Sequence, residues 1–227
     1  YLNFVESAWD PIIPNLNYGE MCDVIISAMT KTHEREQVID FTRSYFTASQ
    51  GVIGGELAGN VDDIQELNEW GIRLGVQSGT NSDLYAQDNL DAATIFAYDD
   101  FPSVIAALNN GDIDYVLGDT AVISVEGPLL TTFNHEEFGI AVREDSQQLL
   151  QALDVSIGGI VNTGEYDLIY ASYFEGALVL TDDRTTTTAT HYPEPTGGSV
   201  LQSVLTSGRL DICTDPFYPP FASYDDT

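Results

Sequence analysis

Positive charge is the scarcest feature of this sequence. Only 7 of the 227 residues are Lys or Arg, against 36 Asp and Glu, so the formal net charge is −29. A protein with this charge repels nucleic acids and anionic lipids, which excludes both as expected partners. A saline source would suit it, because salt screens the self-repulsion of an acidic surface. Since cations are so rare, Arg35, which lies in a Thr-rich segment, is expected to have a specific task.

Cysteine and histidine are also scarce, and long apolar runs are absent. The two cysteines do not make a disulfide framework, and the three histidines lack the spacing of metal ligands, so neither a metal nor another cofactor is expected. The sequence has no run of 18 apolar residues, so no membrane span is expected. The first five residues lack the basic and apolar regions of a signal peptide, and we expect them to form a strand inside a domain.

What the sequence does contain is an alternation of strand and helix patterns. Residues 24–26, 73–76 and 115–119 are largely apolar runs of the kind found in strands buried within a parallel sheet. Residues 149–160 carry apolar side chains at helical spacing. This alternation predicts an α/β fold. Residues 181–198 are rich in Thr, Pro and Gly without a hydrophobic period, which predicts a linker.

Several motifs together resemble the amino-acid-binding family of bacterial solute-binding proteins. They lie at residues 9–16, 23–30, 32–42, 75–80, 111–119 and 208–221. The resemblance implies the type II periplasmic binding fold, an α/β architecture of two lobes joined by two hinge crossings. It assigns residues 1–50 and 139–180 to lobe 1 and residues 51–138 to lobe 2.

The order of these motifs differs from that of the family. The motif Thr-Asp-Pro-Phe-Tyr-Pro-Pro-Phe at 214–221 opens the family's sequences but closes this one. Residues 199–227 are therefore either the opening strand of lobe 1, as in a permuted chain, or the start of the next unit in a tandem array. We favour the tandem array. A strand supplied by a neighbour would add tandem or domain-swapped self-association to the expectations.

The resemblance places a charged clamp for a free amino acid on two residues. Arg35 stands where the family binds the ligand carboxylate, which a planar guanidinium fork matches, and Thr30 and the backbone of Ala28 would add hydrogen bonds. Asp119 stands where the family binds the ammonium group, at the end of a buried strand. Each residue has an alternative role. Arg35 could pair at the surface with a neighbouring carboxylate, and Asp119 could cap the helix that follows it.

The same resemblance implies ligand contacts in lobe 2. Thr80 and Asn81 lie in a turn at 78–82 that opens a helix, whose free N–H groups suit an anion. Gln77 stands where some relatives carry a cation that contacts the ligand side chain. An acidic ligand side chain is therefore not favoured.

Two aromatic residues and one carboxylate complete the candidate set. Trp9 and Tyr218 match the family's aromatic residues that sandwich the aliphatic part of the ligand, and ordinary core packing is the alternative for both. Asp215 resembles a polar contact of the first lobe, provided that the C-terminal segment folds onto this same unit.

The two cysteines are not expected to form a disulfide. In the family their strands are parallel neighbours, but Cys22 would begin its strand and Cys213 would lie near the end of its own. An offset of about four residues corresponds to roughly 13 Å along a strand. A disulfide needs Cα atoms within about 7 Å.

The expected function is binding of a small amino-acid-like ligand by lobe closure, in the periplasm or at the cell surface, with delivery to the permease of an ABC transporter. One alternative is a repeating structural or sensory module built from the same lobes. A dehydratase-like enzyme is a weaker alternative, because no Glu falls at the predicted ligand positions and the nearest in sequence are Glu6 and Glu126. No enzymatic activity is expected.

Overall fold

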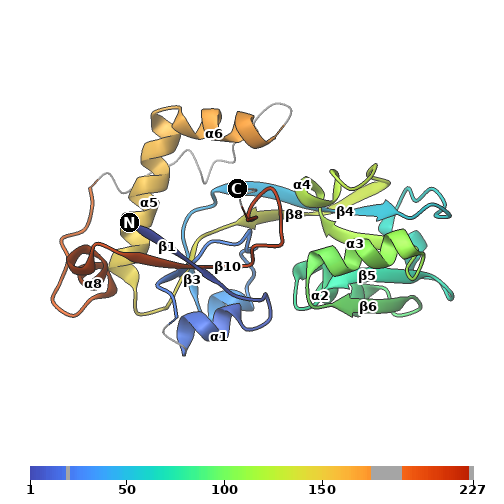
Figure 1. The fold of residues 1–227 in the computed structure, drawn as a ribbon, viewed down its shortest axis with the longest axis horizontal. Helices are drawn as coiled ribbons and strands as arrows, with labels where there is room; N and C mark the ends of the chain where they lie inside the picture. Colours follow the sequence, from blue (N-terminus) through green and yellow to red (C-terminus); the bar gives the residue numbers. More distant parts are fainter. Residues whose placement is uncertain (19–20, 175–190, 225–227) are drawn as a thin grey trace. The chain divides into compact units, whose positions relative to one another are not determined.

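Two five-stranded sheets organise the chain, one mainly in each of two units (Figure 1). The computed structural model describes residues 1–18, 21–174 and 191–224. Unit 1 consists of Tyr1–Ser7, Pro11–Thr47 and Glu137–Thr214, and unit 2 of Ala8–Asp10, Ala48–Glu136 and Asp215–Thr227. The sequence analysis divides the lobes after residues 50 and 138, and the two units of the structure divide after residues 47 and 136. The mixed α/β architecture with two sheets confirms the predicted fold class.

Unit 1 is a sheet with helices packed on it. Its strands are β1 (Leu2–Glu6), β2 (Val24–Ile25), β3 (Asp40–Phe41), β9 (Ala141–Val142) and β10 (Leu210–Thr214), and its helices are α1 (Ile12–Asn17), α5 (Gln147–Asn162), α6 (Glu165–Tyr173), α8 (Val200–Ser207) and the 3-10 helix η1 (Arg35–Gln37). The strand order is β1-β10-β2-β9-β3. The first three strands are parallel, and β9 is antiparallel to both of its neighbours. Ile212 of the sheet packs with Leu149 of α5 and Leu201 of α8 in the core of this unit.

Unit 2 buries both faces of its sheet. Its elements are β4 (Phe46–Gly54), β5 (Arg73–Gln77), β6 (Thr94–Tyr98), β7 (Tyr115–Asp119), β8 (Thr131–Phe138), α2 (Asn81–Asn89), α3 (Phe101–Asn110), α4 (Thr120–Ile123) and the 3-10 helix η2 (Ile64–Leu67). The strand order is β6-β5-β7-β4-β8. In one core, Val52 and Leu117 pack with Ala86 of α2. In a second core, Ile53 and Val116 pack with buried residues of α3. Because side chains alternate along a strand, adjacent residues of β4 and β7 serve opposite faces.

Short polar residues and glycines set the ends of the helices. Asp100 precedes α3, and its carboxylate accepts the N–H of Ser103 at 2.8 Å. The helix ends at Gly111, whose φ of +76° favours glycine. Ser199 and Gly208 bound α8 in the same way. None of the described helices is both long and apolar enough to cross a membrane.

The C-terminal strand β10 lies inside the sheet of its own chain. It pairs in parallel with β1 on one side, where Leu2 is opposite Leu210, and with β2 on the other, where Ile25 is opposite Cys213. Figure 1 shows this red strand beside the dark blue β1. The fold of this chain therefore fills that position without a strand from a neighbouring copy.

Cys22 and Cys213 form a disulfide, so the expectation that they would stay apart is wrong. Their Cα atoms are 5.6 Å apart. The prediction assumed that Cys22 begins a straight strand, but β2 begins at Val24 and Cys22 lies before it. The spacing of residues along a strand therefore does not apply to Cys22. The carbonyl oxygen of Cys22 also accepts a hydrogen bond from Nη1 of Arg143 at 2.9 Å, which fixes this segment.

Removal of the disulfide should destabilise the protein. The two cysteines are 191 residues apart in the sequence, and loss of a cross-link that closes so long a loop typically costs about 2–5 kcal/mol. We expect Cys22→Ser/Cys213→Ser to unfold at a lower denaturant concentration than the wild type. Reductant should move the wild-type midpoint to that of the variant and leave the variant unchanged. A fully reduced wild type, verified by thiol titration, that kept its midpoint would contradict this role.

Candidate functional site

Arg35 is tied to the segment that carries Thr30. Arg35 begins η1, and its Nη1 donates to the carbonyl oxygen of Thr30 at 2.9 Å, while its backbone N–H donates to Oγ1 of Thr32 at 3.3 Å. Thr30 is buried and forms an antiparallel bridge with Phe138. The guanidinium and the Thr30 side chain therefore belong to one fixed part of unit 1. Both are groups that can bind a carboxylate.

Ala28, the third predicted carboxylate contact, has an unusual backbone conformation. Its φ is +48°, in the left-handed region that side chains other than glycine rarely adopt. Its N–H donates to the hydroxyl of Tyr45 at 3.1 Å. A ligand carboxylate at this N–H would therefore have to displace or share the Tyr45 hydroxyl.

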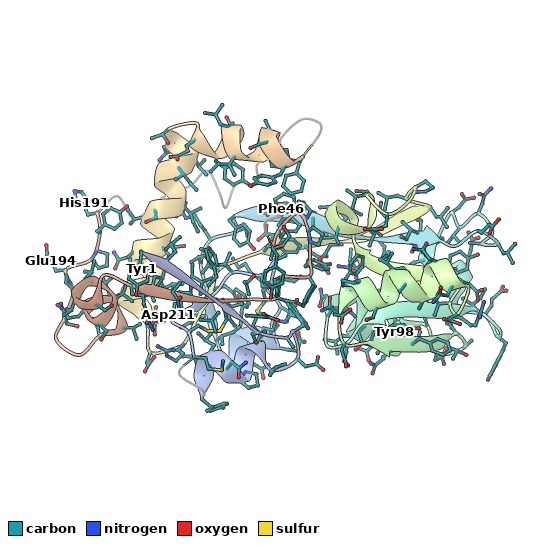
Figure 2. The ribbon with its side chains drawn as sticks, viewed as in Figure 1. Tyr1, Phe46, Tyr98, His191, Glu194 and Asp211 are labelled. Carbon is teal, nitrogen blue, oxygen red and sulfur yellow. A yellow bond between two sulfur atoms is a disulfide. The ribbon has the colours of Figure 1, made fainter. Side chains whose placement is uncertain are left out.

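An aromatic cluster in unit 1 holds the start of β4 next to Tyr45. Phe46, labelled in Figure 2, stacks on Phe138 with ring centroids 5.8 Å apart. It also contacts Tyr170 and Phe174 of the α6 segment, at centroid distances of 6.0 and 4.9 Å. Phe138 is fully buried. The cluster packs the unit 1 ends of β4 and β8, the two strands that continue into unit 2, against one another.

In unit 2, Asp119 is the last residue of β7 and lies opposite Gln50 of β4. It is 7% exposed. Its Oδ1 accepts a hydrogen bond from Nε2 of Gln50 at 2.6 Å, and its Oδ2 accepts one from the hydroxyl of Tyr218 at 2.5 Å. Although Asp119 stands at the N-cap position of α4, its side chain bonds to these two residues rather than to the first turn of that helix. The helix-cap alternative therefore does not explain this carboxylate.

A carboxylate in the first turn of α2 bonds to the turn that precedes this helix. Gly79 has a φ of +68°, and its N–H donates to Oδ2 of Asp83 at 2.9 Å. Thr80 is the N-cap of α2, and its hydroxyl donates to the carbonyl of Gln77 at 2.7 Å. Asn81 donates through its side-chain amide to Oε1 of Glu136. Buried Asp83 thus supplies at the helix N-terminus the negative charge that was expected from a ligand.

Asp215 and Gln77 form a buried pair in unit 2. Nε2 of Gln77 donates to Oδ2 of Asp215 at 2.8 Å, and the backbone N–H of Phe217 donates to Oδ1 at 3.1 Å. Gln77 ends β5, so this contact places the residues after β10 at the carboxyl end of the β5 strand. The condition set for Asp215 as a contact, that the C-terminal segment folds onto the same chain, is met.

The two predicted aromatic contacts also make polar bonds in unit 2. Nε1 of Trp9 donates to the carbonyl of Gly79 at 3.0 Å. The ring of Tyr218 meets that of Phe101 edge-on at 5.5 Å, while its hydroxyl bonds to Asp119. Burial of this hydroxyl, and then the negative charge of Asp119, raise the pKa of Tyr218 well above its usual value.

The structure divides the predicted residues between the units. Ala28, Thr30 and Arg35 lie in unit 1; Trp9, Gln77, Thr80, Asn81, Asp119, Asp215 and Tyr218 lie in unit 2. Sequence reasoning missed Gln50, Ser82 and Glu136, all of which are buried. Neither Gln50 nor Glu136 stands out in the sequence, because β4 also contains Thr47 and Ser49 and β8 contains several polar residues. Glu6 and Glu126, considered as general acids, are both exposed.

Comparison with known proteins gives one consistent family. Residues 1–176 match the model of the bacterial extracellular solute-binding proteins, family 3. The chain is 32% identical over 187 residues to a probable histidine-binding protein of Neisseria gonorrhoeae, covering 76% of this chain and 68% of that one. It is 31% identical over 183 residues to ABC transporter arginine-binding protein 1 of Escherichia coli, covering 75% and 73%.

Solved structures give the same result. An ancestral amino acid-binding protein, described as a precursor of cyclohexadienyl dehydratase, is similar with a TM-score of 0.71 and 28% identity, covering 76% of this chain and 78% of that one. An ancestral arginine-binding protein bound to glutamine is similar with a TM-score of 0.69 and 30% identity, covering 76% and 79%.

The raised pKa of Tyr218 predicts a loss of stability in alkali. Because the folded pKa lies above the unfolded one, the contribution is fully present below about pH 10. It is lost as pH rises towards the folded pKa, by up to about 1.4 kcal/mol per pH unit. We expect Tyr218→Phe to flatten the decline of unfolding free energy between pH 10 and 12. Tyr173→Phe, at a 65% exposed tyrosine, is the control and should keep the wild-type slope. Equal slopes in all three proteins would refute the prediction.

Proposed function

The chain belongs to the bacterial extracellular solute-binding proteins of family 3, and from this premise we propose that its ligand is a free α-amino acid with a cationic side chain. The protein acts outside the cytoplasm and feeds an ABC-type importer. A disulfide suits that compartment, because disulfides persist in oxidising surroundings.

The observation that carries the proposal is the buried carboxylate of Asp119. Two of its hydrogen-bond donors, Gln50 and Tyr218, are neutral, and they orient the carboxylate. The sole Lys or Arg in the sequence of unit 2 is Arg73, whose Nη2 is 2.6 Å from Asp114. A buried carboxylate of this kind is stabilised by a cation, and the α-ammonium group of an amino acid supplies one.

The carboxylate of the ligand is assigned to Arg35 of unit 1. A free amino acid carries both charges on one carbon, and binding it away from water requires a fixed cation as well as a fixed anion. The hydrogen bond from Arg35 to the Thr30 carbonyl fixes the guanidinium, whose five N–H donors suit a carboxylate. Lys31, the neighbouring cation, lacks the planar fork that matches a carboxylate.

A cationic ligand side chain is supported by the other charges of unit 2. Besides Asp119, this unit buries the carboxylates of Asp83, Glu136 and Asp215, and Gln77 contributes a neutral amide. Glu136 contributes to the raised pKa of Tyr218, so its charge is felt where Tyr218 meets Asp119. Such a group of carboxylates favours a second positive charge on the ligand and disfavours an acidic side chain. The names of the histidine- and arginine-binding relatives support the same class.

No observation favours a different class of function. The pairing of β10 within the chain accounts for the C-terminal strand. Domain-swapped self-association and a repeating structural module therefore lose the feature that suggested them. Members of the family are solute-binding proteins, and the ancestral precursor of a dehydratase is itself named an amino acid-binding protein.

Ligand binding should depend on the planar guanidinium group of Arg35 and not only on its positive charge. We expect L-arginine or L-histidine to raise the melting temperature of the wild type in proportion to the logarithm of ligand concentration. Arg35→Lys should weaken binding by about 10-fold or more, the size of a lost charge-assisted hydrogen bond. Arg209→Gln, at an exposed cation of unit 1, is the control and should bind as the wild type does. If no common amino acid stabilised the wild type, the proposed function would be wrong.

The preference for a cationic side chain should depend on Glu136. Titration calorimetry with L-arginine and L-glutamine measures it, because the side chain of the first is positively charged and that of the second is neutral. We expect Glu136→Gln to weaken binding of L-arginine about 10-fold and to change binding of L-glutamine much less. Glu126→Gln makes the same chemical change at an exposed position of unit 2 and should alter neither affinity. An equal loss for both ligands would show that Glu136 does not distinguish side-chain charge.

A further inference from the structure

We propose that Gln50 is a positioning residue, which holds the carboxylate of Asp119 in the orientation that receives the ammonium group of the ligand. The proposal rests on the assignment of Asp119 to ammonium binding. It concerns a residue for which the motifs in the sequence suggest no role.

The strand register places Gln50 directly beside Asp119. Gln50 of β4 and Asp119 of β7 are opposite one another in an antiparallel pair, and Val52 and Leu117 are the next pair on the same face. Both apolar residues are buried in the core with α2. The backbone positions of Gln50 and Asp119 are therefore fixed by the packing of their neighbours. Gln50 itself is 1% exposed.

The orientation of the Gln50 side chain is set by Ser82. The hydroxyl of Ser82, in the first turn of α2, donates to Oε1 of Gln50. This bond makes Oε1 the acceptor side of the amide, so the Nε2 side is directed at Oδ1 of Asp119, 2.6 Å away. The amide thus connects the start of α2 to the end of β7. Asp119 can rotate about its side-chain bonds only by breaking this connection.

The neutrality of Gln50 suits a site that must bind a cation. A Lys or Arg beside Asp119 would also orient the carboxylate, but it would compete with the ammonium group of the ligand. An amide donates a hydrogen bond and leaves the negative charge intact. The bonds from Gln50 and Tyr218 therefore orient the carboxylate with neutral donors.

Packing alone does not account for this residue. A buried amide costs free energy unless its donors and acceptors are satisfied, whereas a leucine of similar size would fill the same space without that cost. Both ends of the Gln50 amide are bonded to other buried side chains, Asp119 and Ser82. The amide therefore has a consequence for Asp119 that an apolar residue would lack.

The decisive variant is Gln50→Glu, measured by titration calorimetry between pH 5 and pH 8. When the introduced carboxyl group is protonated, its O–H replaces the N–H donor and its C=O still accepts from Ser82, so the wild-type bonds are reproduced. When it is ionised, it repels Asp119 and cannot donate. Because two adjacent carboxyl groups raise the pKa of one of them, the protonated form is favoured at low pH. We expect the affinity of this variant, relative to that of the wild type for the same ligand at the same pH, to fall as pH rises.

The probe is whichever of L-arginine, L-histidine and L-glutamine binds the wild type most tightly. Gln50→Leu should weaken its binding about 10- to 100-fold, the effect of losing a hydrogen bond to a charged group. In an Asp119→Asn background the same substitution should have little further effect, because its target has lost its charge. Gln65→Glu, at an exposed glutamine of unit 2, is the matched control and should bind as the wild type does at each pH.

The outcomes distinguish a failure of the proposed function from a failure of the positioning role of Gln50. If the wild type binds none of the three amino acids, the proposed function fails and this inference fails with it. If the wild type binds and Asp119→Asn weakens binding, but Gln50→Glu shows no pH dependence and the effects of Gln50→Leu and Asp119→Asn simply add, only the positioning role is wrong. Recovery of Gln50→Glu at low pH also shows that the variant is folded.

Discussion

The position of β10 between β1 and β2 in the unit 1 sheet is the constraint on which most of this structure depends. β1 and β2 do not pair with each other; each pairs with β10, which the chain reaches only at Leu210. The sheet of unit 1 therefore requires contacts between the two ends of the sequence. Such non-local contacts are costly in chain entropy until they form together. The residues that follow β10 continue into unit 2 and bring Tyr218 to Asp119.

Charge is distributed unevenly between the units, and this distribution defines what the protein can bind. Six of the seven cations of the sequence lie within the ranges of unit 1, and unit 2 contains only Arg73. The buried carboxylates of unit 2 are bonded to amides, hydroxyls and backbone N–H groups such as those of Gln50, Tyr218 and Gly79. Neutral donors orient a carboxylate without adding positive charge of their own. The proposed binding of a cationic ligand depends on this difference between the units.

Much of this arrangement could be predicted from the sequence, for identifiable reasons. The α/β class follows from apolar runs such as β7, and the roles of Arg35 and Asp119 were expected because they stand in motifs that resemble a known family. Gln50 was missed because its significance comes from a strand register that places it opposite a residue 69 positions away. Register between distant strands is not visible in local patterns. The disulfide was misjudged because strand geometry was applied to Cys22, which lies just outside its strand.

The bond between Cys22 and Cys213 also changes the covalent topology of the molecule. It closes residues 22–213 into a covalent ring. A single cleavage of the backbone anywhere between these two cysteines opens the ring but leaves one covalently joined molecule. A molecule cleaved in this way would keep β10 covalently attached beside β2. Only the combination of cleavage and reduction would separate the fragments.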